Sequence, residues 1–160
     1  MKSAAEVLKT ALRNEVKGQH FYQKAAEITK DDTSRMLFLE LADMDDQHAL
    51  VLIERAKDAP CGKDFNPEAY LRELEATVSS RIGRKVRKVL RKGKPKKMLS
   101  LAVKMEKEAR NTYRQLAAQA TSDEVKKFCL ELAQEEQKHA NQLRQLLNSM
   151  DMDADERPGL

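Results

Sequence analysis

The chain carries a set of side chains suited to metal binding, and it repeats this set at one fixed distance. Carboxylates, a histidine and a tyrosine of the first half each recur 91 residues later. A repeat that served packing alone would mainly preserve its apolar residues, whereas this one preserves polar groups. Doubling the set gives four carboxylates and two imidazoles, enough to hold two metal ions. The recurring pairs are Glu15 and Glu106, Tyr22 and Tyr113, Asp45 and Glu136, and His48 and His139.

Helical spacing would place these residues on shared, inward-facing surfaces. Residues three apart on a helix lie about 60° apart, and residues seven apart almost coincide. Asp45 and His48 therefore share a helix face, as do Glu15 and Tyr22, and the second half has the same spacings. Leu and Ala residues extend these faces in both directions, so the polar groups interrupt apolar stripes. Buried unpaired carboxylates cost several kcal/mol, and metal cations would remove that cost.

A single Glu-x-x-His on a helix usually arises by chance among surface residues. The alternative interpretation is therefore that these residues bind no metal. Two copies of a carboxylate three residues before a His, Asp45 with His48 and Glu136 with His139, recur at the same offset, each preceded by a Glu, and favour a dinuclear site instead. Carboxylate and imidazole ligands together suit iron or manganese better than calcium or magnesium. His20 lies five residues after Glu15 and has no counterpart 91 residues later, so we expect it to be a surface histidine.

The sequence predicts an all-α protein with a single domain in residues 1–150. Ala, Leu, Glu, Lys, Gln and Met dominate, Trp is absent, and Gly and Pro are scarce, which is typical of long amphipathic helices. Ser3 and Glu6 form a capping-box pattern at the start of the first helix. Four long helices are expected, over about 3–30, 34–57, 95–120 and 121–150.

Short turns within each half and one long connection between the halves predict the topology. Hairpins 3–57 and 95–150 are joined by a crossover, 58–94, that is too long for a simple turn. Two helical hairpins joined by one long crossover form a ferritin-like four-helix bundle. A short helix from Asn66 to about Ala76 is expected within the crossover, and the acidic tail 151–160 is expected to be disordered.

Charge is unevenly distributed along the chain. The net charge is +4, but residues 81–97 carry ten basic side chains and no acid, which leaves −6 on the rest of the chain. An apolar stripe of Ile82, Val86, Val89 and Leu90 runs along this basic stretch. We interpret the stretch as a solvated connector, and a docking surface for an acidic partner, nucleic acid or phosphate is the alternative.

Hydropathy and cysteine spacing exclude several classes of protein. No apolar run approaches membrane-spanning length and the N-terminus lacks the apolar stretch of a signal peptide, so we expect a cytoplasmic protein without a membrane partner. Cys61 and Cys129 form no Cys-x-x-Cys, which excludes a rubredoxin-type or zinc-ribbon site in this chain. We expect two unpaired thiols, with Cys129 facing the core.

The four long segments resemble the rubrerythrin-related branch of the ferritin-like di-iron proteins. The segments ALRNEVKGQHFYQKAA, FLELADMDDQH, LAVKMEKEARNTYRQLAAQA and CLELAQEEQKH carry the resemblance, which omits most of residues 60–94. It implies two bound iron ions, with manganese or a mixed pair as the alternative. It also implies terminal carboxylates at Glu15 and Glu106, bridging carboxylates at Asp45 and Glu136, imidazole ligands at His48 and His139, and hydrogen-bond or electron donors at Tyr22 and Tyr113.

Three departures from the rubrerythrin pattern affect the expected chemistry. Rubrerythrins carry a rubredoxin domain with an iron held by four cysteines, which serves as a built-in electron donor. This chain has no such set of cysteines. They also use a further Glu three residues after the first Glu of the third helix, where this chain has Ala109. Finally, the shorter Asp45 replaces one bridging Glu. The last two departures bring the ligand set nearer to that of bacterioferritin. They argue against the peroxidase mechanism in which one iron moves and exchanges a ligand for the additional Glu.

The leading hypothesis is a non-haem di-iron oxidoreductase that reduces hydrogen peroxide or dioxygen. An external donor, such as a rubredoxin-like protein, would supply the electrons. The first alternative is a ferroxidase or iron-handling protein in the manner of bacterioferritin. The second is a binding module that keeps a metal pair for stability and uses the basic crossover for a partner, with nucleic acid at residues 81–97 as a less favoured candidate. The long crossover would let two chains exchange hairpins, so a homodimer is expected, with or without exchange.

Overall fold

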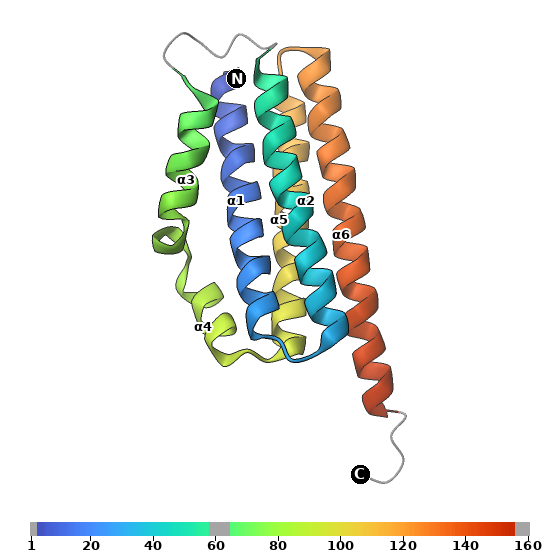
Figure 1. Cartoon of the computed structure of the whole chain (residues 1–160). Helices are drawn as coiled ribbons and strands as arrows, with labels where there is room; N and C mark the ends of the chain where they lie inside the picture. Colours follow the sequence, from blue (N-terminus) through green and yellow to red (C-terminus); the bar gives the residue numbers. More distant parts are fainter. Residues whose placement is uncertain (1–2, 58–64, 156–160) are drawn as a thin grey trace.

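A computed structural model describes residues 3–57 and 65–155 of the chain. Every element in these two segments is a helix, and four long helices lie side by side (Figure 1). The predicted all-α helical bundle is therefore confirmed. Within the described segments, no helix combines the length and the apolar character needed to cross a lipid bilayer. The helices are α1 (Ala4–Ile28), α2 (Asp32–Ala56), α3 (Pro67–Arg81), α4 (Arg84–Lys92), α5 (Pro95–Gln119) and α6 (Asp123–Asp155).

The long helices form two hairpins, because α1 packs most extensively on α2 and α5 on α6. Local polar contacts determine where the first hairpin's helices begin. The Ser3 hydroxyl accepts a hydrogen bond from the Glu6 N–H at 3.2 Å, and the Ser3 N–H donates to the Glu6 carboxylate at 2.7 Å, which is the predicted capping box. Helix α2 begins earlier than predicted because the Asp31 carboxylate caps it, accepting from the Ser34 N–H at 2.8 Å.

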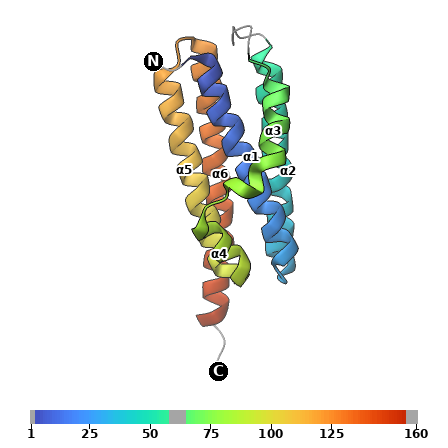
Figure 2. The ribbon, with the colours of Figure 1, turned by 90° about the vertical axis from the view of Figure 1, so that its left-hand side faces the viewer.

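The crossover between the hairpins contains α3 and α4, which lie against the outside of the bundle (Figure 2). The Asn66 side chain caps α3 at the predicted position, by accepting a hydrogen bond of 3.0 Å from a backbone N–H of the first turn. Helix α3 continues to Arg81, beyond the predicted end near Ala76, because one apolar face remains buried against α1. The buried residues of this face are Leu71, Leu74 and Val78.

The basic stretch of the crossover forms α4. Leu90 is buried in the bundle core, and Val86 and Val89 are partly buried beside it, as the apolar stripe predicts. All six Arg and Lys side chains of α4 are exposed. The helix therefore attaches to the bundle through one apolar face and presents its positive charge to solvent.

Helix α6 is longer than the sequence predicts. It continues to Asp155, so residues 151–155 are helical rather than disordered, and the remainder of the acidic tail lies outside the described residues. The Asp151 carboxylate lies 2.8 Å from Lys96 Nζ, which ties this end of α6 to the start of α5. Composition alone favours disorder here, but a helix propagates readily from preceding helical turns.

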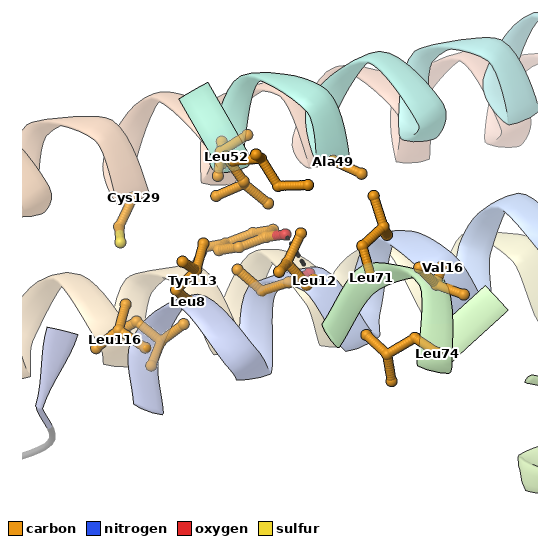
Figure 3. Close-up of a cluster of buried hydrophobic side chains, with 14 of the residues drawn as sticks. Leu8, Leu12, Val16, Ala49, Leu52, Leu71, Leu74, Tyr113, Leu116 and Cys129 are labelled. Carbon is orange, nitrogen blue, oxygen red and sulfur yellow. Dashed lines mark hydrogen bonds between the residues drawn. The ribbon is translucent and has the colours of Figure 1, made fainter. Parts of the chain in front are cut away.

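Two clusters of buried apolar side chains fill the bundle, one toward each end. The first is shown in Figure 3 and draws on α1, α2, α3, α5 and α6. The second contains Phe21, Phe38 and Leu99 among others. Along α1, Leu12 belongs to the first cluster and Phe21 to the second, with the buried Glu15 between them. Burial of apolar surface thus holds the helices together on both sides of a polar layer.

Cys129 contributes a thiol to the first cluster, as predicted. The thiol is free and buried, and burial raises its pKa to about 11. It is therefore protonated and unreactive at neutral pH. Cys61 lies outside the described residues.

The junction between α4 and α5 requires a glycine. Gly93 ends α4 with a left-handed φ of 62°, and a Cβ placed on it would lie 2.7 Å from Cγ2 of Ile28. We expect Gly93→Ala to lower the free energy of unfolding by about 1–3 kcal/mol, because backbone strain and this clash act together. Gly83→Ala is the matched control, since nothing lies within 4 Å of a Cβ placed there. Urea unfolding followed by circular dichroism measures both, and equal losses in the two variants would contradict this explanation.

Candidate metal centre

Six candidate metal ligands meet in the polar layer between the two apolar clusters. All six were identified from the sequence repeat, and all come from one chain. Five of them are at most 4% exposed, and His48 keeps 14% of its side chain exposed. The four long helices contribute them in mid-helix: Glu15 from α1, Asp45 and His48 from α2, Glu106 from α5, and Glu136 and His139 from α6.

The six residues form two groups that share one member. In each group every residue offers a ligand atom, and these atoms all lie within 4.8 Å of one another. Glu136 belongs to both groups, whereas Asp45 belongs to only one of them. The layer is therefore nearly, but not fully, symmetric. The first group is Glu15, Asp45, His48 and Glu136, and the second is Glu106, Glu136 and His139.

The two imidazoles face the carboxylates through their Nδ1 atoms. His48 Nδ1 lies 3.4 Å from Glu15 Oε2 and 3.8 Å from Glu136 Oε1. His139 Nδ1 lies 3.6 Å from Glu106 Oε2 and 3.5 Å from Glu136 Oε2. Each oxygen of Glu136 thus faces a different histidine. The two rings are nearly parallel, at 17°, with their centroids 6.0 Å apart.

Each tyrosine of the repeat reaches from its own hairpin to the other one. Tyr22 of α1 donates a hydrogen bond to Glu106 Oε1 on α5, and Tyr113 of α5 donates one of 2.5 Å to Glu15 Oε1 on α1. In both glutamates the second oxygen, Oε2, is the one that faces the imidazole. Tyr113 lies within the first apolar cluster (Figure 3), and Tyr22 stacks on Phe38.

Both tyrosines stay protonated in this layer. Burial, followed by the charges of the neighbouring carboxylates, raises the pKa of Tyr22 and of Tyr113 well above the ordinary value. Each phenol therefore remains a hydrogen-bond donor. The two bonds fix the orientation of Glu106 and Glu15, which is how outer groups position metal ligands.

The crowded acids have pKa values shifted in both directions. Burial, followed by the charges of Glu15 and Glu106, raises the pKa of Asp45 well above its usual value. Burial and a hydrogen bond with Glu106 likewise raise the pKa of Glu136. Burial also acts to raise the pKa of Glu106, but its interactions with the neighbouring Glu136 and His139 outweigh it, and the net pKa is lowered. Without cations, the layer therefore relies on protons to limit the repulsion among its carboxylates.

A cavity of about 230 Å³ lies between α1 and α5 and reaches the layer. The exposed Lys17 and Glu108 line its outer part, and Asn14 and Thr112 are also in its wall. The carboxylates Glu15, Asp45, Glu106 and Glu136 line its inner part. The cavity gives a small molecule access to the groups that face the histidines.

Sequence reasoning identified the carboxylates that line this cavity, but not the cavity itself or the role of Gly18 in it. Gly18 and Ala109 occupy equivalent positions of the repeat, and both line the cavity. The available signal was Gly18 itself, because a glycine is unfavourable in a helix interior unless something requires it. His20, interpreted as a surface histidine, is partly buried and belongs to neither group of ligands.

The sequence model of one protein family, described as rubrerythrin, matches residues 6–89 and 97–158. The chain belongs to the rubrerythrin family. The match covers nearly all of the four long helices, all six candidate ligands and most of the crossover, so the resemblance drawn from the sequence is confirmed. A comparison with curated proteins finds no match, and neither does a comparison with solved structures.

Rubrerythrins typically bind iron, and the residues of this layer fit such a metal. Nδ1 of His48 and both ring nitrogens of His139 are buried, yet none has an aligned hydrogen-bond partner among the residues that the structure describes. Unpartnered buried nitrogens are costly, and a metal ion facing the carboxylates would satisfy the Nδ1 atom of each ring. Carboxylates mixed with imidazoles are donors suited to iron or manganese.

We expect the metal-free protein to lose stability as the pH rises above the ordinary carboxyl range, because the raised pKa values of Asp45 and Glu136 let the folded chain hold protons that the unfolded chain has released. Carboxyl groups of the unfolded chain titrate near about 4. The stabilising contribution of the two acids is therefore complete below that pH and is lost as the pH rises through their raised folded-state pKa values. Glu106 has a lowered pKa, so its contribution to stability changes only at a lower pH.

Asp45→Asn tests this pH dependence, because the amide keeps the shape of the protonated carboxyl and does not titrate. Melting is followed by circular dichroism in the presence of a chelator, between pH 5 and 7.5. The melting temperature of the wild type should fall relative to that of the variant by roughly 2–8 °C over this range. A difference that does not change with pH would contradict the raised pKa of Asp45.

Proposed function

We propose that this rubrerythrin-family protein is a di-iron oxidoreductase that reduces hydrogen peroxide with electrons from an external donor. The observation that carries the proposal is the pair of buried carboxylate–histidine groups that share Glu136. This arrangement matches the carboxylate and Glu-x-x-His ligand set of the di-iron proteins built on four-helix bundles. The cavity of about 230 Å³ supports a small oxidant rather than a bulky substrate.

The proposed ligands divide between two iron ions. Both ions would contact Glu136, which has one oxygen toward each histidine. The hydrogen bonds of Tyr22 and Tyr113 would hold the terminal carboxylates in place during turnover. One ion would be held by Glu15, Asp45, His48 and Glu136, and the other by Glu106, Glu136 and His139.

The surrounding residues meet the other requirements of peroxide reduction. Converting hydrogen peroxide to two molecules of water takes two electrons and two protons. Bound iron would supply the electrons, and the donor would replace them. The apolar clusters on both sides of the layer exclude bulk water, so peroxide and protons would enter through the cavity between α1 and α5. Restricted access protects reactive species from side reactions.

The basic surface of α4 is the proposed docking site for the electron donor. Its exposed residues Arg84, Lys88, Arg91 and Lys92 belong to a stretch without acids. Lys85 lies beside Lys104 of α5, and this like-charged neighbour lowers the pKa of Lys85. Such a concentration of positive charge favours and steers an acidic partner. We therefore propose a small acidic redox protein as the donor.

Removing either histidine should reduce iron binding. We expect about two iron ions per wild-type chain after anaerobic reconstitution, and one or fewer in His48→Ala and in His139→Ala, with affinity lowered at least about tenfold. His20→Ala is the matched control, because His20 belongs to neither group of ligands. Iron is measured by mass spectrometry after gel filtration. Unchanged iron content in both histidine variants would show that the ligands are assigned incorrectly.

The reduced protein should react faster with peroxide than with air. Stopped-flow absorption after mixing the diferrous protein with stoichiometric peroxide, or with air-saturated buffer, compares the two oxidants directly. We expect oxidation by peroxide to be at least about tenfold faster, corresponding to about 1.4 kcal/mol in the activation barrier, without growth of a ferric mineral. Accumulation of many iron ions per chain would instead identify an iron-storage protein, and faster oxidation by air would identify an oxidase.

A further inference from the structure

The glycine within α1 packs against a candidate metal ligand of α2. Gly18 has ordinary helical backbone geometry, since Gly93 is the one described glycine with a positive φ. A glycine in a helix interior costs about 1 kcal/mol relative to alanine, so backbone conformation does not explain it. Close approach does, because a Cβ built on Gly18 would overlap Asp45 Oδ2 and lie 3.3 Å from Asp45 Cγ. The absent side chain leaves the space that the Asp45 carboxylate occupies.

The second half of the repeat has a different pair at the equivalent positions. Ala109 stands 91 residues after Gly18, and Glu136 stands 91 residues after Asp45. The second half therefore combines an alanine with the longer glutamate side chain. The first half combines a glycine with the shorter aspartate side chain. Because Asp is one methylene shorter than Glu, its carboxylate stays closer to its own helix. The backbone at Gly18 lets α1 come near enough for that shorter side chain to join the layer.

The two carboxylates occupy different places in the layer. Glu136 belongs to both ligand groups, with its oxygens 3.8 Å from His48 Nδ1 and 3.5 Å from His139 Nδ1. Asp45 belongs only to the group of Glu15 and His48. One position therefore has four candidate ligands and the other has three. Ala109 lines the same cavity as Glu106 and Glu136, and its methyl group offers no ligand atom.

We propose that Gly18 is a positioning residue that places Asp45 on one metal ion only, so that the two metal positions are unequal. The position bounded by Glu15, Asp45 and His48 binds its ion more tightly, and Glu136 alone joins the two positions. The proposal rests on the proposed metal-binding function and deepens it. It assigns an order of filling to the centre, in which the ion held by Glu106, Glu136 and His139 is the more exchangeable one.

Anaerobic titration of the metal-free protein with Co²⁺, followed by absorption and calorimetry, resolves the two binding steps. In the wild type we expect steps that differ in affinity by at least about tenfold. In Gly18→Ala the new methyl group displaces Asp45, so the tighter step should weaken by about tenfold or more while the weaker step changes less than about threefold. Combining Gly18→Ala with Asp45→Glu gives the first half the pair of the second half and should make the two steps nearly equal.

Ala109→Gly is the matched control, because it changes one methyl group on the same cavity at the equivalent position. It should leave the tighter step unchanged. Asp45→Ala removes the carboxylate without adding a methyl group and should weaken the same step as Gly18→Ala. Adding Gly18→Ala to Asp45→Ala should have no further effect, and this double variant contains no clash that could prevent folding. Circular dichroism checks the helical content of each variant.

The outcomes separate this inference from the proposed function. Two binding steps of equal affinity in the wild type would overturn the role of Gly18 and leave the metal centre intact. The same would follow if Gly18→Ala bound Co²⁺ with the affinities of the wild type. An effect of Gly18→Ala that persists without the Asp45 carboxylate would also overturn it, because Gly18 would then act through another contact. A wild-type protein that binds no Co²⁺ and no Fe²⁺ would overturn both.

Discussion

The burial of four carboxylates in one layer of the bundle is the constraint on which the rest of the structure depends. Like charges repel strongly where water is excluded, so the layer needs protons, hydrogen bonds or cations around it. Tyr22 and Tyr113 supply hydrogen bonds across the hairpins, and the raised pKa values of Asp45 and Glu136 favour their protonated forms. Apolar clusters on both sides hold the helices in register. Metal binding would replace the protons and couple the chemistry of the layer to the stability of the bundle.

The internal repeat gives this layer an approximate two-fold symmetry, and the departures from it show where the halves have different roles. The crosswise tyrosine–glutamate bonds obey the symmetry. The apolar surroundings do not, because Phe38 stacks on Tyr22 while its counterpart in the first cluster is Cys129. The carboxylates also differ, since Asp45 joins one ligand group and Glu136 joins both. A symmetric scaffold therefore carries an asymmetric centre, and the asymmetry lies in the residues nearest to the candidate metal positions.

The polar layer and the long helices could be predicted because their signals are local. Helical spacing places Asp45 beside His48, and the repeat indicates which of many glutamates matter. Element ends were less predictable. Helix α3 extends because its apolar face is buried against the distant α1, and α6 propagates into an acidic segment whose composition favours disorder. The sharing of Glu136 and the exclusion of Asp45 from the second group depend on distances between helices, which sequence spacing does not contain. The contact at Gly18 is the clearest case. The sequence shows a glycine within a helix, but it does not show that Asp45 packs against it.

The central claim is that the polar layer binds two iron ions joined by Glu136. Anomalous diffraction at the iron absorption edge, from crystals of the iron-reconstituted protein, tests it most directly. We predict two anomalous peaks within about 4 Å of each other, one bounded by Glu15 and His48, the other by Glu106 and His139, with Glu136 in contact with both. A single peak, or iron bound outside the six residues of the layer, would contradict the account.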